Sequence, residues 1–287
     1  AETPKFDLAA GVYQGTQTVS ITEQPNSTIT YTLDGKDPTR SSTAYTGPVT
    51  ISKTAVLRAR AFTDGLYGSD SADATYIIET GASSVQDHTL TLPVMSLITD
   101  PDNLWDPDKG IYVLGNKYAT ATGEDATGTT MEGLMNHESS TLANFWQGWE
   151  RPVHFDLIGD DGTLEYAQDA VVRIFGAYSR AKEQKPFAII ARPGYGPSMM
   201  NHAFFTSRPF TSYKSVILRP SAQDNTFSRI RDIVVTSLFE DGGDYGLPPE
   251  SQIYVQGYRQ MVLYLNGKYW GVYNLREKIT SNFLAQH

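Results

Sequence analysis

The sequence predicts a mainly β protein, in which a β-sandwich is followed by a mixed α+β unit. Short alternating apolar and polar segments, separated by turn residues, fill the first 80 positions. Strand-like segments return after residue 150, and one clear helical pattern follows them. Abundant tyrosine and threonine favour strands throughout.

Length and composition indicate a folded two-domain protein. With 287 residues, 40% of them hydrophobic and 11% aromatic, the chain can bury two cores. We expect a β-sandwich at residues 1–80, a linker at 81–90 and an α+β unit at 91–287. The formal net charge is −9 and no basic stripe is present, so nucleic acid is not expected as a partner.

The sequence contains no cysteine, which excludes disulfides and cysteine metal sites. No apolar run approaches the ~20 residues that span a bilayer, so no transmembrane segment is predicted. The first residues, AETP, do not form a signal peptide. If the protein is exported, we expect this chain to be a mature or trimmed form.

The first unit contains five strand-like segments, at residues 18–21, 28–33, 49–51, 55–62 and 74–78. Turn pairs such as Asp34-Gly35 and Gly47-Pro48 separate them, a spacing typical of a β-sandwich. The run YTLDGKDPT at 31–39, followed by GPVTI and LRARAF, resembles the immunoglobulin-like module at the C-terminus of chitobiases and β-hexosaminidases. This resemblance spans residues 4–78 and implies a fold more than a function.

The second unit combines strands with one helix. Strand-like segments recur at 153–157, 170–175, 187–190 and 216–218. A helix is predicted over 227–239, with Asn225 or Thr226 as its cap and Gly242-Gly243 at its end. One face of this helix collects apolar residues, namely Phe227, Ile230, Val234 and Leu238.

The most informative stretch runs from Gln260 to Phe283, QMVLYLNGKYWGVYNLREKITSNF. Asn266-Gly267 tolerates the positive φ angles of a two-residue hairpin turn, so two strands are predicted to meet there. The run from Tyr264 to Glu277 resembles the signature of the spore-coat protein H (CotH) family. Those proteins are secreted bacterial atypical protein kinases. The resemblance therefore implies ATP and Mg²⁺ as cofactors and a secreted or cell-surface location.

Two more segments extend the resemblance over residues 170–283. In the first, RIFGAYSR runs from Arg173 to Arg180, and Ala177 and Tyr178 replace a polar pair that the family usually has. The second comprises LRPS at 218–221, Asp-Asn at 224–225 and the helical pair Arg231-Asp232.

The resemblance implies that four residues face a nucleotide: Arg173, Arg180, Lys185 and Glu277. Lys185 would meet phosphate as a point charge, and Glu277 would brace a lysine or a metal. Arg173, Lys185 and Glu277 are then expected to converge on one cleft at the exposed end of the hairpin. A second interpretation stays open, in which the three cations only decorate a solvent-exposed edge.

The catalytic aspartates of that family would follow the hairpin, and this sequence stops at His287. We therefore expect this chain to be the N-terminal portion of a CotH-like kinase. It would then contain no catalytic residue and would transfer no phosphate by itself. The alternative function is a surface protein without enzymatic activity that serves adhesion or glycan binding. A protein substrate would be the partner in the first case, and a surface polysaccharide in the second.

An acidic string before Gly110 resembles a calcium loop; it contains Asp100, Asp102, Asp106 and Asp108. It lacks the ligand order of an EF-hand and the terminal bidentate glutamate. Asp-Pro pairs commonly form turns, so both a cation site and plain turns stay open. The five histidines have no ligand spacing, and the sequence therefore predicts no zinc site.

Overall fold

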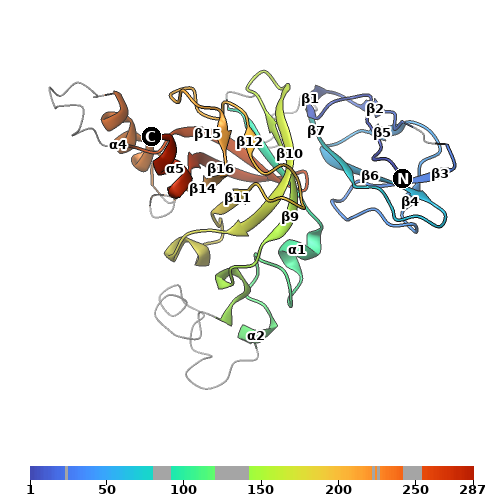
Figure 1. Cartoon of the computed structure of the whole chain (residues 1–287), viewed down its shortest axis with the longest axis horizontal. Coiled ribbons are helices and arrows are strands. Elements are labelled where there is room, and N and C mark those ends of the chain that lie inside the picture. Colours follow the sequence, from blue (N-terminus) through green and yellow to red (C-terminus); the bar gives the residue numbers. More distant parts are fainter. Residues whose placement is uncertain (23–24, 80–91, 120–141, 222–223, 225–226, 242–253) are drawn as a thin grey trace. The chain divides into compact units, whose positions relative to one another are not determined.

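The computed structural model describes residues 1–22, 25–79, 92–119, 142–221, 224, 227–241 and 254–287 (Figure 1). The linker expected at 81–90 lies outside these residues. Contacts divide the chain into two compact units. The first contains Ala1–Leu104, Pro152–Asp169 and Val262–Gly271, and the second contains Trp105–Arg151, Ala170–Met261 and Val272–His287. The domain limits 1–80 and 91–287 stay a prediction.

In the N-terminal part, five strands form one sheet in the order β1-β7-β6-β3-β4 (Figure 1). They are β1 (Gly11–Gln14), β3 (Ser27–Thr32), β4 (Thr43–Ala44), β6 (Ala55–Thr63) and β7 (Ala72–Glu79). A second sheet pairs β2 (Gln17–Val19) with β5 (Val49–Ile51). Their alternating apolar residues meet in a core around Ile29, Leu57 and Tyr76. The predicted immunoglobulin-like sandwich is confirmed.

Seven further strands are hydrogen-bonded in the order β10-β11-β14-β16-β15-β8-β9 and close into a barrel. They are β8 (Val94–Ile98), β9 (Arg151–Ile158), β10 (Leu164–Ile174), β11 (Phe187–Ile190), β14 (Ser215–Arg219), β15 (Tyr258–Leu265) and β16 (Lys268–Glu277). A separate pair joins β12 (Met200–Asn201) to β13 (Ser212–Tyr213). Six of these strands were predicted, but β8 and the closure were not, because the closure depends on pairing between distant segments such as β8 and β15.

The predicted hairpin forms between β15 and β16. Asn266 and Gly267 have φ angles of 48° and 75°, as a two-residue type I′ turn requires. The Asn266 Oδ1 atom accepts a hydrogen bond from the backbone N–H of Thr99 at 2.9 Å. Gly35, with φ of +86°, lies against this amide, and a Cβ atom there would approach Asn266 Cγ to 2.6 Å. Only glycine fits at position 35 without displacing Asn266.

Within the described residues, the helices are α1 (Pro101–Trp105), α2 (Asn116–Ala119), α4 (Arg231–Asp241) and α5 (Ser281–Gln286). Two 3₁₀ turns accompany them, η3 (Asn144–Trp146) and η4 (Tyr178–Ala181). The remaining described segments are loops and turns. Figure 1 shows α5 next to the C-terminus of the chain.

The predicted helix at 227–239 starts later than expected and presents a different face. The Asp224 carboxylate accepts hydrogen bonds from the backbone N–H groups of Ser228 and Arg231, at 3.3 and 3.0 Å, and holds the preceding residues in a turn. The expected apolar face is exposed, with Phe227 at 73% and Leu238 at 60%, whereas Ile233 is buried. The predicted start and buried face are therefore wrong; the expected caps at 225–226 and 242–243 lie outside the described residues.

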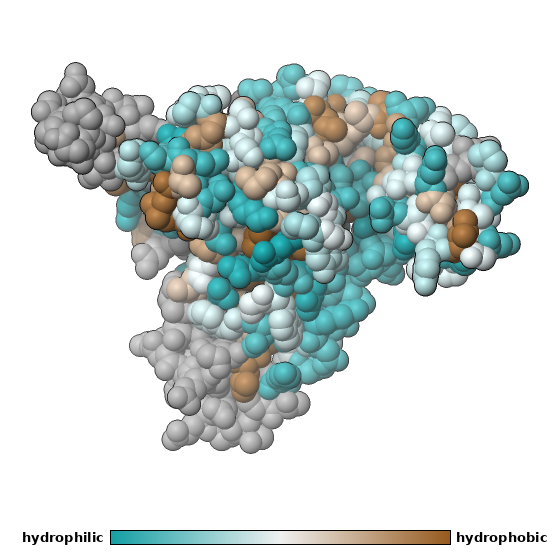
Figure 2. Space-filling model, viewed as in Figure 1, coloured by the Kyte–Doolittle hydropathy of each residue, from teal (hydrophilic) through white to brown (hydrophobic). Residues whose placement is uncertain are grey.

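No helix within the described ranges is long and apolar enough to cross a membrane. On the face drawn in Figure 2, hydrophobic residues lie singly or in small groups among hydrophilic ones.

Candidate functional site

Strand register places Arg173 on a sheet face that carries several cations. Arg173 of β10 lies opposite Ala188, Ala188 opposite Ile217, and Ile217 opposite Arg276 of β16. Residues that lie opposite one another in paired strands point to the same face. This face, called the cationic face below, carries Arg173 and Arg276, and the alternation continues to Lys278.

An apolar cluster fills the middle of the cationic face. Val171, Ala188, Ile190 and Ile217 are buried there, and Phe175 packs against them. The ammonium nitrogen of Lys278 lies 5.8 Å from the centre of the Phe175 ring. The charged group of Lys278 therefore lies at the edge of this apolar cluster.

The carboxylate of Glu150 is bonded to one cation of this face and lies within the electrostatic reach of two more. Arg192 donates two hydrogen bonds to Glu150, at 3.0 and 2.6 Å. These bonds lower the pKa of Glu150, and the charges of Arg173 and Lys278 lower it further. Burial lowers the pKa of Lys278, and the charge of Arg173 adds to this effect. The charges of Arg173, Arg192 and Lys278 are thus close enough to Glu150 to interact electrostatically with it.

The Arg173 side chain leaves a donor without a partner at this cluster. Its Nε atom is buried and has no hydrogen-bond acceptor among the described residues. A buried N–H without an acceptor costs roughly 1–3 kcal/mol. An anion that reaches the cluster would satisfy this donor and balance the excess positive charge.

Arg180 and Lys185 hold a loop together. The Arg180 guanidinium donates to the carbonyl oxygen of Gly176, and at 3.2 Å to that of Trp146. Lys185 is buried and donates from Nζ to the carbonyl oxygens of Arg180 and Lys182, at 2.7 and 2.9 Å. Both cations therefore bind the protein's own backbone.

The environment of Lys185 is aromatic as well as buried. Its ammonium nitrogen lies 4.1 Å from the centre of the Phe145 ring and 5.3 Å from that of Tyr112. Burial lowers the pKa of Lys185 to about 8. This lysine is therefore closer to neutrality than a surface lysine at physiological pH.

Glu277 lies on the face opposite Arg173. It pairs with Val216, so it points away from the face that carries Ile217 and Arg276. Its carboxylate accepts hydrogen bonds from Arg208 Nε at 2.8 Å and from the backbone N–H of Gly257 at 2.6 Å. The expected convergence of Arg173, Lys185 and Glu277 on one cleft is therefore wrong. Neighbouring residues of a strand point to opposite faces, so Glu277 points away from the face that Arg276 shares with Arg173.

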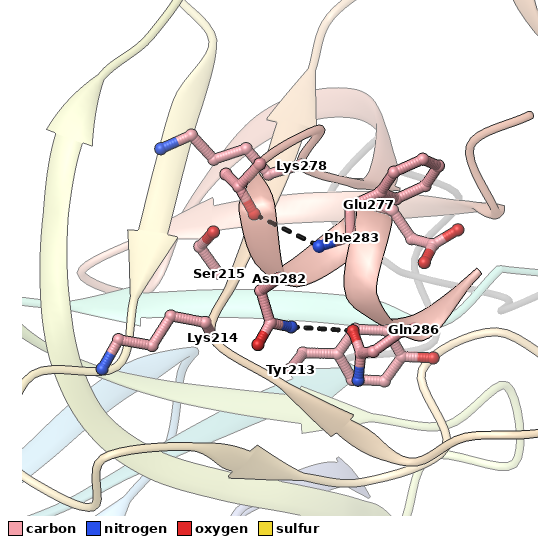
Figure 3. Close-up of a pocket in the computed structure, with 9 residues that line it drawn as sticks. Tyr213, Lys214, Ser215, Glu277, Lys278, Asn282, Phe283 and Gln286 are labelled. Carbon is pink, nitrogen blue, oxygen red and sulfur yellow. Dashed lines mark hydrogen bonds between the residues drawn. The ribbon is translucent and has the colours of Figure 1, made fainter.

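A small polar pocket lies beside Glu277, between the end of β16 and helix α5 (Figure 3). Lys214, Ser215 and Lys278 line one side of it. Asn282 donates to the side chain of Gln286 at 2.7 Å across the other side, as the dashed line in Figure 3 shows. Lys278 thus lines this pocket as well as the cationic face.

Helix α4 is attached to the cationic face by Asp232 and Thr236. Asp232 accepts a hydrogen bond from Arg276, and its Oδ2 atom lies 3.0 Å from Arg219 Nη1. Thr236, one turn later, accepts a second bond from Arg276 at 3.0 Å. Asp232 thus pairs with both Arg276 and Arg219, whereas no carboxylate of the described residues forms an ion pair with Arg173 or Lys278.

Two protein-family models match parts of this chain. A family model described as chitobiase/beta-hexosaminidase C-terminal domain matches residues 8–75, and one described as CotH kinase protein matches residues 172–287. Both resemblances are confirmed, in the predicted order. A search of curated proteins found no match. The cationic cluster lies largely within the CotH segment, which contains Arg173, Arg192 and Lys278.

The CotH resemblance directed attention to Arg173 but missed its neighbours. Lys278 follows Glu277 directly, and strand alternation alone would have separated the two onto opposite faces. Arg192 and Glu150 are 42 residues apart in the sequence, and no local pattern signals their pairing. The structure adds these three residues to the candidate site.

The acidic string at 100–108 forms the short helix α1 and the turn that follows it. Asp100 Oδ1 accepts the backbone N–H of Asp102 at 2.9 Å, and Asp106 Oδ1 accepts those of Asp108 and Lys109 at 2.8 and 2.9 Å. The backbone donors lower the pKa of Asp106. Asp108 accepts a bond from Asn116 at 2.8 Å. These contacts favour the interpretation as turns, and a cation at this string stays a prediction.

Proposed function

We propose that the CotH segment is the nucleotide-binding portion of a kinase-related protein, and that the cationic face receives the phosphates. The observation that carries this proposal is the gathering of Arg173, Arg192 and Lys278 around the single carboxylate of Glu150. Guanidinium groups bind phosphate oxygens with two parallel hydrogen bonds, and a lysine adds a point charge. The buried Nε of Arg173 supplies a donor that still needs an acceptor.

Within this proposal, Arg180 and Lys185 have a structural role and do not contact the phosphates. Both bind backbone carbonyl groups and so stabilise the loop between β10 and β11. Glu277 has a structural role too, because its carboxylate accepts hydrogen bonds from Arg208 and from the backbone N–H of Gly257. We assign ATP as the nucleotide, since CotH proteins are described as kinases. Mg²⁺ would be held mainly by the phosphates, because Glu150 is already bonded to Arg192.

The test is a titration of the whole chain with a fluorescent ATP analogue in the presence of Mg²⁺. Arg173→Ala and Lys278→Ala are each expected to weaken binding about ten- to hundredfold, since each removes a charge-assisted contact of roughly 1.5–3 kcal/mol. Lys36→Ala is the matched control, because Lys36 is an exposed lysine of the sandwich. Equal affinity of all three variants and the wild type would contradict the assignment.

A second function concerns the sandwich. Tyr67 is 97% exposed and Leu66 is 60% exposed, both between β6 and β7. Exposed tyrosine rings provide flat stacking surfaces for sugars, and the domain that matches residues 8–75 is named after enzymes of carbohydrate breakdown. We propose glycan binding or adhesion at a bacterial cell surface, or after secretion, as the alternative role. Retention of the chain on insoluble polysaccharide, lost in Tyr67→Ala, would support it; equal retention of the two would count against it.

A further inference from the structure

A cluster in the first unit gathers an imidazole and several carboxylates from three strands. One ligand atom each of Asp73 (β7), His154 (β9) and Asp169 (β10) lies within 4.8 Å of the other two. The Oδ1 atom of Asp156 lies 3.3 Å from His154 Nε2. The neighbouring strand β7 is held to Asp156 by the backbone N–H of Thr75, which donates to its Oδ2 atom at 2.9 Å.

This cluster contains more negative than positive charge. The side chains of Asp73 and Asp156 are only 4% and 1% exposed. Arg58 binds both oxygens of Asp73, at 2.9 and 3.1 Å, and it also pairs with Asp37. The carboxylates of Asp37, Asp73, Asp156 and Asp169 thus lie near the permanent positive charge of Arg58. Those of Asp37 and Asp169 are 56% and 47% exposed, so an added cation can reach them from solvent.

The position of His154 points the same way. Its Nδ1 atom lies 2.6 Å from Asp169 Oδ1, so both ring nitrogens face carboxylate oxygens. An imidazole nitrogen that has lost its proton is itself a metal ligand, so the ring and these oxygens form one set of donor atoms.

We propose that Asp73, His154 and Asp169 bind a divalent transition-metal ion such as Zn²⁺ or Mn²⁺. The ion replaces the proton on the imidazole, and imidazole with carboxylates is a ligand set that both metals accept. Asp156 stands beside it and ties the site to β7 through Thr75. The Asp169 side chain is 47% exposed, which opens a path for the ion from solvent.

The proposal is tested with the full chain, stripped of metal by a chelator. Mn²⁺ is titrated and the free ion is followed by its electron paramagnetic resonance signal, while Zn²⁺ is tested by thermal unfolding. The wild type is expected to take up one Mn²⁺ per chain and to melt at a higher temperature with Zn²⁺. Asp169→Asn and His154→Gln are each expected to weaken Mn²⁺ binding by about tenfold or more.

Asp64→Asn is the matched control, because Asp64 is a fully exposed carboxylate of the same unit. It should bind Mn²⁺ as the wild type does. If His154→Gln does not fold, Asp169→Asn decides, since its half-exposed side chain can change to an isosteric amide at little cost. Mn²⁺ that stays free with the wild type, or that binds Asp169→Asn and Asp64→Asn equally well, overturns the proposal.

Discussion

The carboxylate of Glu277 and the guanidinium of Arg208 form a buried ion pair, with Nε and Oε2 2.8 Å apart. Their side chains are 2% and 9% exposed. The pair joins the end of β16 to the loop before β13, and His287 Nε2 lies 3.2 Å from the other carboxylate oxygen. Glu277, which resemblance alone assigned to a nucleotide, is the centre of a structural contact between three segments.

Arg208→Met is therefore expected to reduce the free energy of unfolding strongly. The substitution leaves Glu277 buried with less counter-charge, a change that typically costs about 3–5 kcal/mol. Urea unfolding followed by circular dichroism measures the loss. Lys36→Met is the control, because the exposed Lys36–Asp34 pair should contribute less than about 1 kcal/mol. Similar losses in the two variants would refute the role given to the Arg208–Glu277 pair.

The buried amine of Lys185 predicts a pH dependence of stability. Its pKa in the folded protein is about 8, below the ordinary 10.5. Between these values the unfolded chain holds a proton that the folded chain lacks, so stability rises with pH across this window. The wild type should gain up to about 3 kcal/mol relative to Lys185→Met between pH 8 and 10.5.

Urea unfolding of both proteins at pH 7.5, 9 and 10.5 measures this difference. The decisive quantity is the free energy of unfolding of the wild type minus that of Lys185→Met. If this difference falls or stays constant as the pH rises, Lys185 is not in an environment that disfavours its charge. Lys36→Met again provides a comparison with an exposed lysine.

Glu150→Gln should strengthen the binding of a nucleoside triphosphate at the cationic face. The substitution removes the one carboxylate among Arg173, Arg192 and Lys278 and releases Arg192 from its pair. An increase in affinity of about three- to tenfold is expected for a charge at this distance near the surface. The titration used for Arg173→Ala measures it, and weaker binding would contradict a phosphate site there.

Gly35→Ala should destabilise the protein more than Gly15→Ala. Both glycines have positive φ angles, +86° and +66°, so both substitutions cost about 1–2 kcal/mol of backbone strain. Only at Gly35 would the new Cβ meet another side chain, Asn266, at 2.6 Å. The difference between the two melting temperatures isolates that contact, and equal temperatures would show that Asn266 yields without cost.

Much of the fold could be predicted because its signals are local. The hairpin at Asn266-Gly267 and the strands of the sandwich follow from turn chemistry and from side chains that alternate between two faces. The helix at 227–239 was placed only approximately, because Asp224 holds the residues before Arg231 in a turn. An apolar pattern at helical spacing indicated burial, yet Phe227 and Leu238 are exposed.

By itself, the sequence determined the two-part architecture, its mainly β character, the hairpin and the CotH resemblance that led to Arg173. The tertiary structure alone decided that the strands close into a barrel and that Arg173 and Glu277 occupy opposite faces. It also placed Lys278 and Arg192 beside Glu150, and His154 between Asp156 and Asp169. The reason is that turn and strand preferences act between neighbours in the chain, whereas these sites depend on the register of strands many residues apart, where a shift of one residue reverses the face of every side chain.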